Sequence, residues 1–210
     1  MGPKKEFRTA LIDALAEIGA AAVSAPMLDK LERHYRMLAQ WNSKLNLTRI
    51  IKPKDAARLH YAESIFAGKF LGNARLLLDV GSGAGFPAAP LAITNPSLEV
   101  MALEPNMKKG VFLNEAKDQL ALANFHVMQD RIENIDRSSF QAITSRAIEN
   151  AGSVYSELIT GLIRGSTLLL FCSGDLVTTL GQSAPPNVQG EAYLIPGSKD
   201  RYVATFKRRI

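Results

Sequence analysis

The sequence predicts an α/β fold in which a mostly parallel, seven-stranded sheet with an antiparallel edge carries a short helical cap at its N-terminus. Strand-like apolar segments alternate with helical segments from Leu76 onward, a glycine-rich turn follows the first strand, and two strand-like segments end the chain. Alternating strands and helices form parallel sheets that are covered on both faces. With 210 residues and 47% hydrophobic content, the chain can bury one sizeable core.

The N-terminal segment is expected to form the helical cap. Apolar residues recur at three- and four-residue steps between Pro26 and Leu45, as on one face of a helix. A second helix is expected to begin at Pro53, because proline suits a first helical turn, and to end near Ala67. We therefore expect a cap over residues 1–70 and one compact domain over residues 71–210.

The later elements are predicted from apolar runs and the turns that bound them. Buried strands are expected at residues 76–80, 98–103, 125–128, 140–144 and 167–171. Helices are expected after the glycine turn, with Pro87 and Pro90 in the first turn, and at about residues 106–122 and 150–163. A closing antiparallel pair is expected at residues 192–195 and 202–206.

Positive charge is concentrated in the N-terminal third of the chain. The net charge is +5, and the first 60 residues hold eleven basic against six acidic residues. Lys30, Arg33 and Arg36 recur at helical spacing opposite the apolar stripe, where they could contact RNA phosphates. An ordinary solvated basic face would have the same pattern, and the sequence leaves both interpretations open.

Composition argues against several classes of protein. No apolar run reaches the roughly 18 residues of a transmembrane helix, and Asp13 and Glu17 interrupt the N-terminal apolar stretch that a signal peptide would need. The single cysteine, Cys172, cannot form an internal disulfide, and the three histidines lack metal-ligand spacing. We therefore expect a cytoplasmic protein with neither a metal nor a membrane partner.

The turn after the first strand is the strongest functional signal. Its glycines allow a tight turn and a close approach of a ligand to the main chain. A dinucleotide fingerprint, Gly-x-Gly-x-x-Gly, would need glycine where Phe86 stands. The spacing Gly-x-Gly-x-Gly, with an acidic residue two places before it, instead follows the S-adenosylmethionine pattern. The residues expected to bind this cofactor here are Asp79, Gly81, Gly83 and Gly85, with Glu104 after the next strand accepting both ribose hydroxyls.

The segment after the third strand is expected to lie beside the adenine of the cofactor. An adenine ring needs an apolar face and main-chain hydrogen bonds, which Ile132 and Glu133 could supply. Arg131 and Glu133 could equally form a surface ion pair.

Six motifs in chain order resemble the bacterial small-subunit ribosomal RNA methyltransferase G family, also called glucose-inhibited division protein B. They are Asn46-Leu47-Thr48, His60-x-x-Glu63-Ser64, Asp79-Val80-Gly81-Ser82-Gly83-Ala84-Gly85-Phe86-Pro87, Lys108-Lys109-x-x-Phe112-Leu113, Arg131-x-Glu133 and Ser145-Arg146-Ala147. The resemblance covers roughly residues 28 to 150. The sequence departs from the family pattern at Glu63, Ala88, Gln141 and Ser173.

This resemblance implies a class I, Rossmann-like, S-adenosylmethionine-dependent methyltransferase that modifies N7 of a guanine in 16S ribosomal RNA. The implied cofactor-binding residues are Gly81, Phe86, Ile132, Glu133 and Arg146. The implied catalytic residues, near the transferring methyl group or the RNA, are Arg146, Asn46 and His60. The expected partner is ribosomal RNA or the small ribosomal subunit, and the expected state is a monomer.

The chemistry of guanine N7 agrees with the residues present. N7 carries a lone pair and no proton, so its methylation needs alignment rather than a general base. A guanine stacked in folded RNA is hard to reach, so we expect the base to be extruded or presented in a loop. Other hypotheses remain open at this point: a methyltransferase for another RNA or a small molecule, a non-catalytic binding module, and an NAD(P) oxidoreductase.

Overall fold

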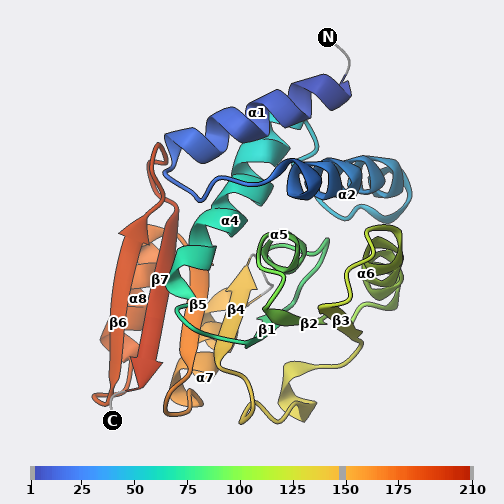
Figure 1. Ribbon diagram of the computed structural model, residues 1–210. Coiled ribbons are helices and arrows are strands. Elements are labelled where there is room, and N and C mark those ends of the chain that lie inside the picture. Colours follow the sequence, from blue (N-terminus) through green and yellow to red (C-terminus); the bar gives the residue numbers. More distant parts are fainter. Residues whose placement is uncertain (1–2, 147–149, 209–210) are drawn as a thin grey trace.

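The computed structural model describes residues 3–146 and 150–208, and its strands form one sheet in the order β3-β2-β1-β4-β5-β7-β6 (Figure 1). The strands are β1 (Leu76–Val80), β2 (Glu99–Leu103), β3 (Phe125–Met128), β4 (Ala142–Arg146), β5 (Thr167–Cys172), β6 (Val188–Leu194) and β7 (Tyr202–Arg208). The first five pair in parallel, whereas β7 pairs antiparallel with both β5 and β6. The predicted mostly parallel sheet with an antiparallel edge is confirmed.

The helices agree with the sequence patterns where an amphipathic stripe or a starting proline marks them. They are α1 (Pro3–Glu17), α2 (Ala25–Leu45), α3 (Pro53–Ala56), α4 (Glu63–Ala67), α5 (Ala88–Thr94), α6 (Met107–Gln119), α7 (Ala151–Thr160) and α8 (Gly174–Ser183). There is also one π-helical turn, η1 (Ala57–Ala62), and there are two 3₁₀ turns, η2 (Gly68–Phe70) and η3 (Ile132–Asn134), among the described residues. The sequence predicted neither α1 nor α8.

The predicted starts of two strands were wrong by two and four residues. Strand β4 begins at Ala142 rather than at residue 140. Phe140 still belongs to the preceding turn, because its amide donates a hydrogen bond to the carbonyl oxygen of Arg137. Strand β6 begins at Val188 rather than at residue 192, and most of its side chains are exposed. A strand with so little burial leaves no apolar run in the sequence to mark its start.

The strands bury alternate residues on opposite faces, as the pleat of a sheet requires. Leu77 and Leu169 pack with the cap helices, α5 and α6 on one face. Leu78 and Leu168 pack with α7 and α8 on the other face. Both faces are therefore covered, which is the usual situation of a parallel sheet.

The N-terminal helices pack directly onto this first face (Figure 1). Phe7 of α1 stacks on Tyr35 of α2 with ring centroids 4.2 Å apart, and its ring also meets Tyr61 edge-on at 4.9 Å. Tyr61 in turn contacts Phe86, which lies in the glycine turn just before α5. The cap and the sheet thus share one buried cluster, and the boundary near residue 70 stays a prediction.

The expected helix over residues 53–67 is present, but its middle is widened. Residues Ala57–Ala62 form a π-helical turn between α3 and α4. Such turns insert an extra residue into a helix and are frequent at functional sites. This one carries His60, which the turn directs toward the carboxyl ends of the strands.

Candidate cofactor and substrate pocket

The glycine turn between β1 and α5 needs glycine at three positions. Gly81, Gly83 and Gly85 have φ values of 73°, 57° and 86°, a region that side chains rarely adopt. The amides of Gly81 and Ser82 both donate to the carbonyl oxygen of Leu103, at 2.9 and 3.0 Å. These bonds fix the turn against the end of β2 and leave its backbone facing the carboxyl edge of the sheet.

Glu104 lies where a ribose would meet this turn. Its side chain is buried, and its two carboxylate oxygens accept hydrogen bonds from the amides of Gly83 at 2.8 Å and Asn106 at 2.9 Å. Each oxygen keeps further acceptor capacity after one bond. The carboxylate is therefore held in place and can still accept two hydroxyl donors.

Asp79 lies beneath the turn as a buried acid without a matching donor. It is fully buried, and neither oxygen has a hydrogen-bond partner of proper geometry among the described residues. Burial raises the pKa of Asp79 to about 7, and the nearby Ser82 hydroxyl and Ala88 amide only partly offset this effect. Such a group is costly unless a positive ligand group compensates for it.

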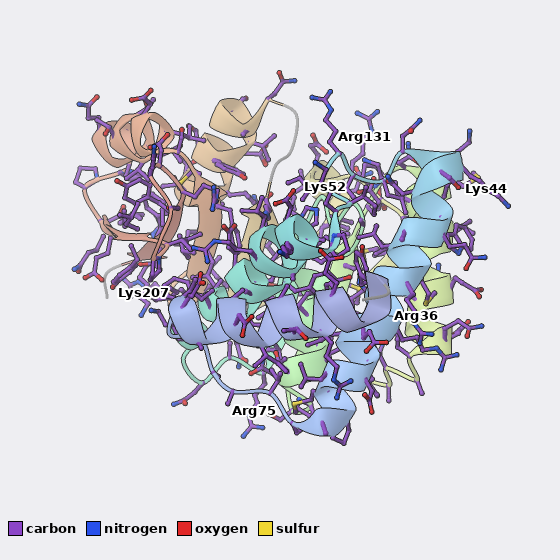
Figure 2. All side chains as sticks on the ribbon, turned by 90° about the horizontal axis from the view of Figure 1, so that it is seen from above. Arg36, Lys44, Lys52, Arg75, Arg131 and Lys207 are labelled. Atoms are coloured by element: carbon purple, nitrogen blue, oxygen red, sulfur yellow. The ribbon has the colours of Figure 1, made fainter. Side chains whose placement is uncertain are left out.

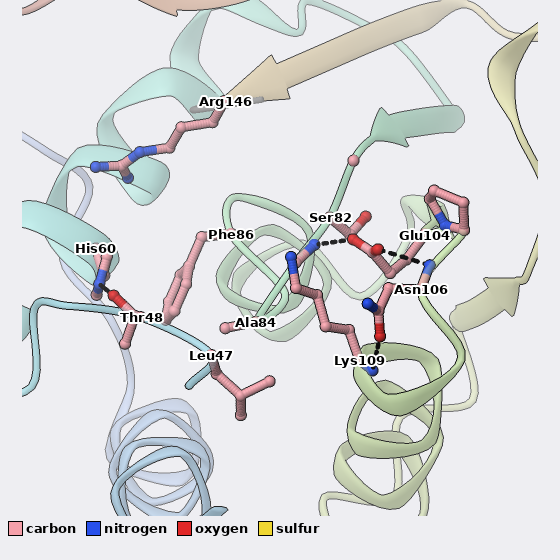
Figure 3. Close-up of a pocket in the computed structure, with 13 residues that line it drawn as sticks. Leu47, Thr48, His60, Ser82, Ala84, Phe86, Glu104, Asn106, Lys109 and Arg146 are labelled. Carbon is pink, nitrogen blue, oxygen red and sulfur yellow. Dashed lines mark hydrogen bonds between the residues drawn. The ribbon is translucent and has the colours of Figure 1, made fainter. Parts of the chain in front are cut away.

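A cavity of about 470 Å³ opens at the carboxyl ends of β1, β2 and β4 (Figure 3). Figure 3 shows Glu104, Asn106 and Lys109 on one side of it, and His60, Thr48 and Phe86 on the other. The full lining is Leu47, Thr48, His60, Gly81, Ser82, Gly83, Ala84, Phe86, Glu104, Pro105, Asn106, Lys109 and Arg146. One cavity therefore joins the glycine turn to side chains from the cap.

His60 forms part of an aromatic wall in this cavity. Its ring stacks on Phe86 with centroids 4.4 Å apart, and its Nε2 lies 2.9 Å from the Thr48 hydroxyl. Burial, and next the charge of Arg146, lower the pKa of His60 to about 3. The imidazole is therefore neutral at physiological pH and is a poor proton acceptor there.

Arg146 reaches the cavity from the end of β4. Its Nη2 donates to the carbonyl oxygen of Leu59 in the π-helical turn and to Glu63 Oε2 at 3.2 Å. Its guanidinium lies over the ring of Phe171, 5.0 Å from the centroid, and burial lowers its pKa, against the opposing effect of Glu63. A guanidinium remains charged even so. Ala147, the last residue of its motif, lies outside the described residues.

Several predicted site residues do not line the cavity. Asn46 is exposed, and its backbone adopts a left-handed conformation at the end of α2. Its neighbours Leu47 and Thr48 line the cavity instead. Ile132 is packed into the cluster beneath α7, and Glu133 is exposed. Asp79 and Gly85 support the turn from behind rather than lining the cavity.

The predicted phosphate-binding face lies at the far end of α2 from the cavity. Lys30 donates to the carbonyl oxygen of Ala121 at 3.3 Å, Arg33 donates to Gln119, and Arg36 pairs with Glu32 at 3.9 Å. The contacts of Lys30 and Arg33 lie at the end of α6, whereas the cavity lies at its beginning. Figure 2 shows Lys44, Lys52 and Arg131 toward one side of the molecule in that view and Arg75 toward the opposite side.

Lys109 is a cavity residue that the prediction missed. It lies in the first turn of α6, where Asn106 caps the helix by accepting from the amides of Lys108 and Lys109. The pair Lys108-Lys109 stood in the quoted motifs, and a lysine one turn after a strand's carboxyl end could have pointed to it. Among the described residues, no cluster of three or more acidic, histidine or cysteine side chains could hold a metal, and no helix is long and apolar enough to cross a membrane.

Comparisons with known proteins agree with this geometry. The family model described as rRNA small subunit methyltransferase G matches residues 27–181. The Bacillus velezensis protein named Ribosomal RNA small subunit methyltransferase G is 35% identical over 190 residues, covering 86% of this chain and 79% of that protein. The protein of the same name from Bacillus subtilis is 33% identical over 187 residues, covering 84% of this chain and 77% of that protein.

Solved structures share the fold at lower identity. An O-methyltransferase from Bacillus cereus in complex with SAH superposes with a TM-score of 0.62 at 17% identity, covering 84% of this chain and 91% of that chain. A SAM-dependent O-methyltransferase from Thermotoga maritima gives a TM-score of 0.58 at 16% identity, covering 82% of this chain and 72% of that chain. Both are similar to the chain in fold.

Proposed function

The chain belongs to the rRNA small subunit methyltransferase G family and is an S-adenosylmethionine-dependent methyltransferase of ribosomal RNA, and we propose that it methylates N7 of a guanine in 16S ribosomal RNA. The observation that carries the proposal is the single cavity that joins the glycine turn and Glu104 to His60, Phe86 and Arg146. A cofactor and a purine can share that cavity with their reacting atoms in line.

The residues of the turn side fit the cofactor. Glu104 would accept the two ribose hydroxyls, and the backbone of residues 81–84 would lie against the amino-acid end. Asp79, buried beneath the turn without a donor, would balance the cofactor's ammonium group. S-adenosylmethionine supplies an electrophilic methyl group on a sulfonium sulfur. Ile132 and Glu133 remain proposals for the adenine, since neither lines the cavity.

The residues of the cap side suit a purine that gives up no proton. His60 is neutral and stacked on Phe86, so it extends an aromatic surface against which a base can lie. Positive charge develops on the purine as N7 attacks, and a bare cation nearby would oppose it. Glu63 neutralises part of the Arg146 charge, so that Arg146 can recognise a guanine acceptor atom such as O6 at a smaller electrostatic cost.

Recognition of the surrounding RNA requires cations around the cavity mouth. Lys109 lines the cavity, while Lys30, Arg33 and Arg36 lie farther along α2 and would meet only RNA that extends past α6. We propose that the target base is extruded into the cavity, as for other enzymes that act on stacked bases. Asn46, which is exposed and precedes the cavity residue Leu47 in the chain, could then contact the strand. The proposed setting is a monomer acting on the small ribosomal subunit in the cytoplasm.

The test combines cofactor binding with methyl transfer. Isothermal titration with S-adenosylhomocysteine, with NAD as control, should give binding only for the former. Purified protein and labelled S-adenosylmethionine should then methylate undermethylated small ribosomal subunits, and nuclease digestion with mass spectrometry should identify 7-methylguanosine. Binding without transfer would move the proposal to another substrate or to a non-catalytic module. A labelled product other than 7-methylguanosine would refute the N7 assignment.

A further inference from the structure

Arg201 is a half-exposed cation that is fixed at one end and free at the other. Its Nε donates to Glu63 Oε1 at 2.7 Å, and 43% of its side chain is exposed. Among the described residues, its two terminal amino groups make neither a hydrogen bond nor an ion pair. A guanidinium whose Nε is anchored and whose two terminal amino groups are free has the geometry to bind two oxygens of a phosphate.

Two guanidiniums share the one carboxylate of Glu63. Glu63 is 1% exposed and bonds Arg201 through Oε1 and Arg146 through Oε2. One positive charge of the trio therefore remains unbalanced, and Nη1 of Arg146 is buried without a partner within the described residues. The pKa of Arg146 is lowered mainly by burial, and the Arg201 charge lowers it further. An anion beside the pair would relieve this repulsion.

The fold puts Arg201 at the cavity edge of the sheet. Tyr202 pairs with Cys172 at the carboxyl end of β5, and Phe171 pairs with Arg146 at the end of β4. The loop before β7 is closed by bonds that the Arg201 carbonyl accepts from the Ile195 amide at 2.8 Å and the Ser198 hydroxyl at 3.0 Å. The neighbouring Asp200 accepts from the Gly174 amide at 2.8 Å and so bonds toward α8.

The strand order separates Arg201 from the cofactor half of the cavity. The turn and Glu104 follow β1 and β2, whereas Arg201 follows β6 and precedes β7, with β4 and β5 between. Arg201 is also absent from the cavity lining. The cofactor carboxylate is therefore a less suitable anion for Arg201 than a phosphate on a polymer that crosses the mouth.

We propose that Arg201 binds a backbone phosphate of the RNA strand beside the target nucleotide and, through Glu63, holds Arg146 in position in the cavity. The inference rests on the proposed function and adds the residue that couples strand binding to the reacting base. Arg201 is a positioning residue in this scheme: the phosphate is held by its terminal amino groups, and its Nε fixes the carboxylate that orients Arg146.

The experiment compares Arg201→Gln, Arg201→Lys and the control Arg75→Gln. Arg75 is exposed and precedes β1 at the opposite edge of the sheet. Binding to undermethylated small ribosomal subunits is measured by filter retention between 50 and 200 mM salt. For Arg201→Gln we expect a roughly fivefold weaker affinity and a salt slope smaller by about 1, as for one lost phosphate contact. Arg75→Gln should match the wild type.

Lysine at position 201 separates the two parts of the proposal. It keeps a charge for the phosphate, but its three donors lie on one nitrogen, Nζ, so it cannot reproduce the planar fork that bonds Glu63 at one end and two phosphate oxygens at the other. Arg201→Lys should therefore keep most of the affinity and the salt slope while its kcat falls roughly tenfold. Affinity for S-adenosylhomocysteine should stay within twofold in every variant.

The outcomes that overturn the inference are distinct from those that overturn the proposed function. Unchanged particle affinity and salt slope in Arg201→Gln would remove the phosphate contact, and an equal loss of S-adenosylhomocysteine affinity would assign Arg201 to the cofactor. If the wild type transfers no methyl group, the proposed function fails, but the binding comparison still decides the phosphate contact. Should Arg201→Gln fail to fold, the affinity and kcat of Arg201→Lys decide instead.

Discussion

Asp79 shows how a single residue can weaken the fold where the ligand binds. It is fully buried beneath the glycine turn, and its pKa is raised to about 7 from an ordinary value of 3.8. The folded protein therefore holds a proton that the unfolded chain has already lost between these two pH values. By linkage, the free energy of unfolding falls as the pH rises through that window.

Asp79→Asn should remove this pH-dependent loss. Without ligand, the melting temperature of the variant minus that of the wild type should increase as the pH rises from 4 to 8. We expect the increase to reach a few degrees at pH 8. The same variant should bind S-adenosylhomocysteine roughly tenfold more weakly, because the carboxylate that balances the ammonium group is gone. Thermal melts across this pH range check the first effect and titration the second. A constant difference in melting temperature at all pH values would contradict the raised pKa.

Of Gly83 and Gly85 in the turn, Gly85 is the glycine where an added side chain would meet more resistance. Its φ is 86°, and an added Cβ would lie 3.2 Å from the Cβ of Ala89 and 3.3 Å from Leu113. Gly85→Ala should destabilise the protein by about 2 kcal/mol through backbone strain and overpacking. Gly152→Ala in α7 is the matched control, because nothing lies within 4 Å of its added Cβ. Urea unfolding should show that control to be neutral or slightly stabilising.

At the residue scale, the sequence predicted the turn better than the side chains opposite it. Gly81, Gly83 and Glu104 line the cavity because a local motif and a strand end determine where they lie. The place of Leu47 at the cavity and the pairing of Glu63 with Arg201 depend on elements far apart in the chain. Spacing along one segment contains no information about such contacts.

The two ends of α2 provide a test at the scale of the element. Lys30 and Arg33 hydrogen bond residues at the end of α6, while Lys44 lies in the last turn of α2, just before the cavity residues Leu47 and Thr48. Figure 2 shows Lys52 and Arg131 toward the same side as Lys44. Cations nearer the cavity should meet the strand that carries the target base.

Two triple variants compare these ends. Changing Lys44, Lys52 and Arg131 to glutamine should weaken binding to small ribosomal subunits more than changing Lys30, Arg33 and Arg36. The first set should lower the salt slope by about 2 to 3, one unit for each lost phosphate contact. Both sets should keep their affinity for S-adenosylhomocysteine. A larger loss from the second set would restore the interpretation first drawn from the sequence.

Elements were predictable where a helix shows a clear apolar stripe or a strand is a continuous apolar run, and were missed where neither signal is present. Helix α2 shows a clear apolar stripe, and β1 and β5 are apolar runs. Helix α1 buries Phe7, Leu11 and Leu15, yet a helix that begins with charged residues resembles other N-terminal segments. Helix α8 has only Leu180 fully buried, so its sequence reads as a loop after β5. Long-range packing, rather than local preference, determines both helices.

The shared core predicts how the whole molecule unfolds. One buried cluster contains Phe7 and Tyr61 from the cap together with Leu77 and Leu169 from the sheet, so the cap has no separate core to keep it folded alone. Trp41, the only tryptophan, lies in the cap against Phe112 of α6, with ring centroids 5.8 Å apart. Its fluorescence therefore reports on the cap, while far-ultraviolet circular dichroism reports on the whole chain.

Urea unfolding followed by both signals should give coincident transitions, as expected for a single cooperative unit. Saturating S-adenosylhomocysteine should move both midpoints upward together, because a ligand that binds only the folded state stabilises every part coupled to it. At a hundredfold excess over Kd the gain should be about 2.7 kcal/mol. A tryptophan transition that precedes the circular dichroism transition, and that the ligand leaves in place, would make residues 1–70 an independent domain. The cavity would then be assembled by docking of that domain, because Leu47, Thr48 and His60 reach it from the cap.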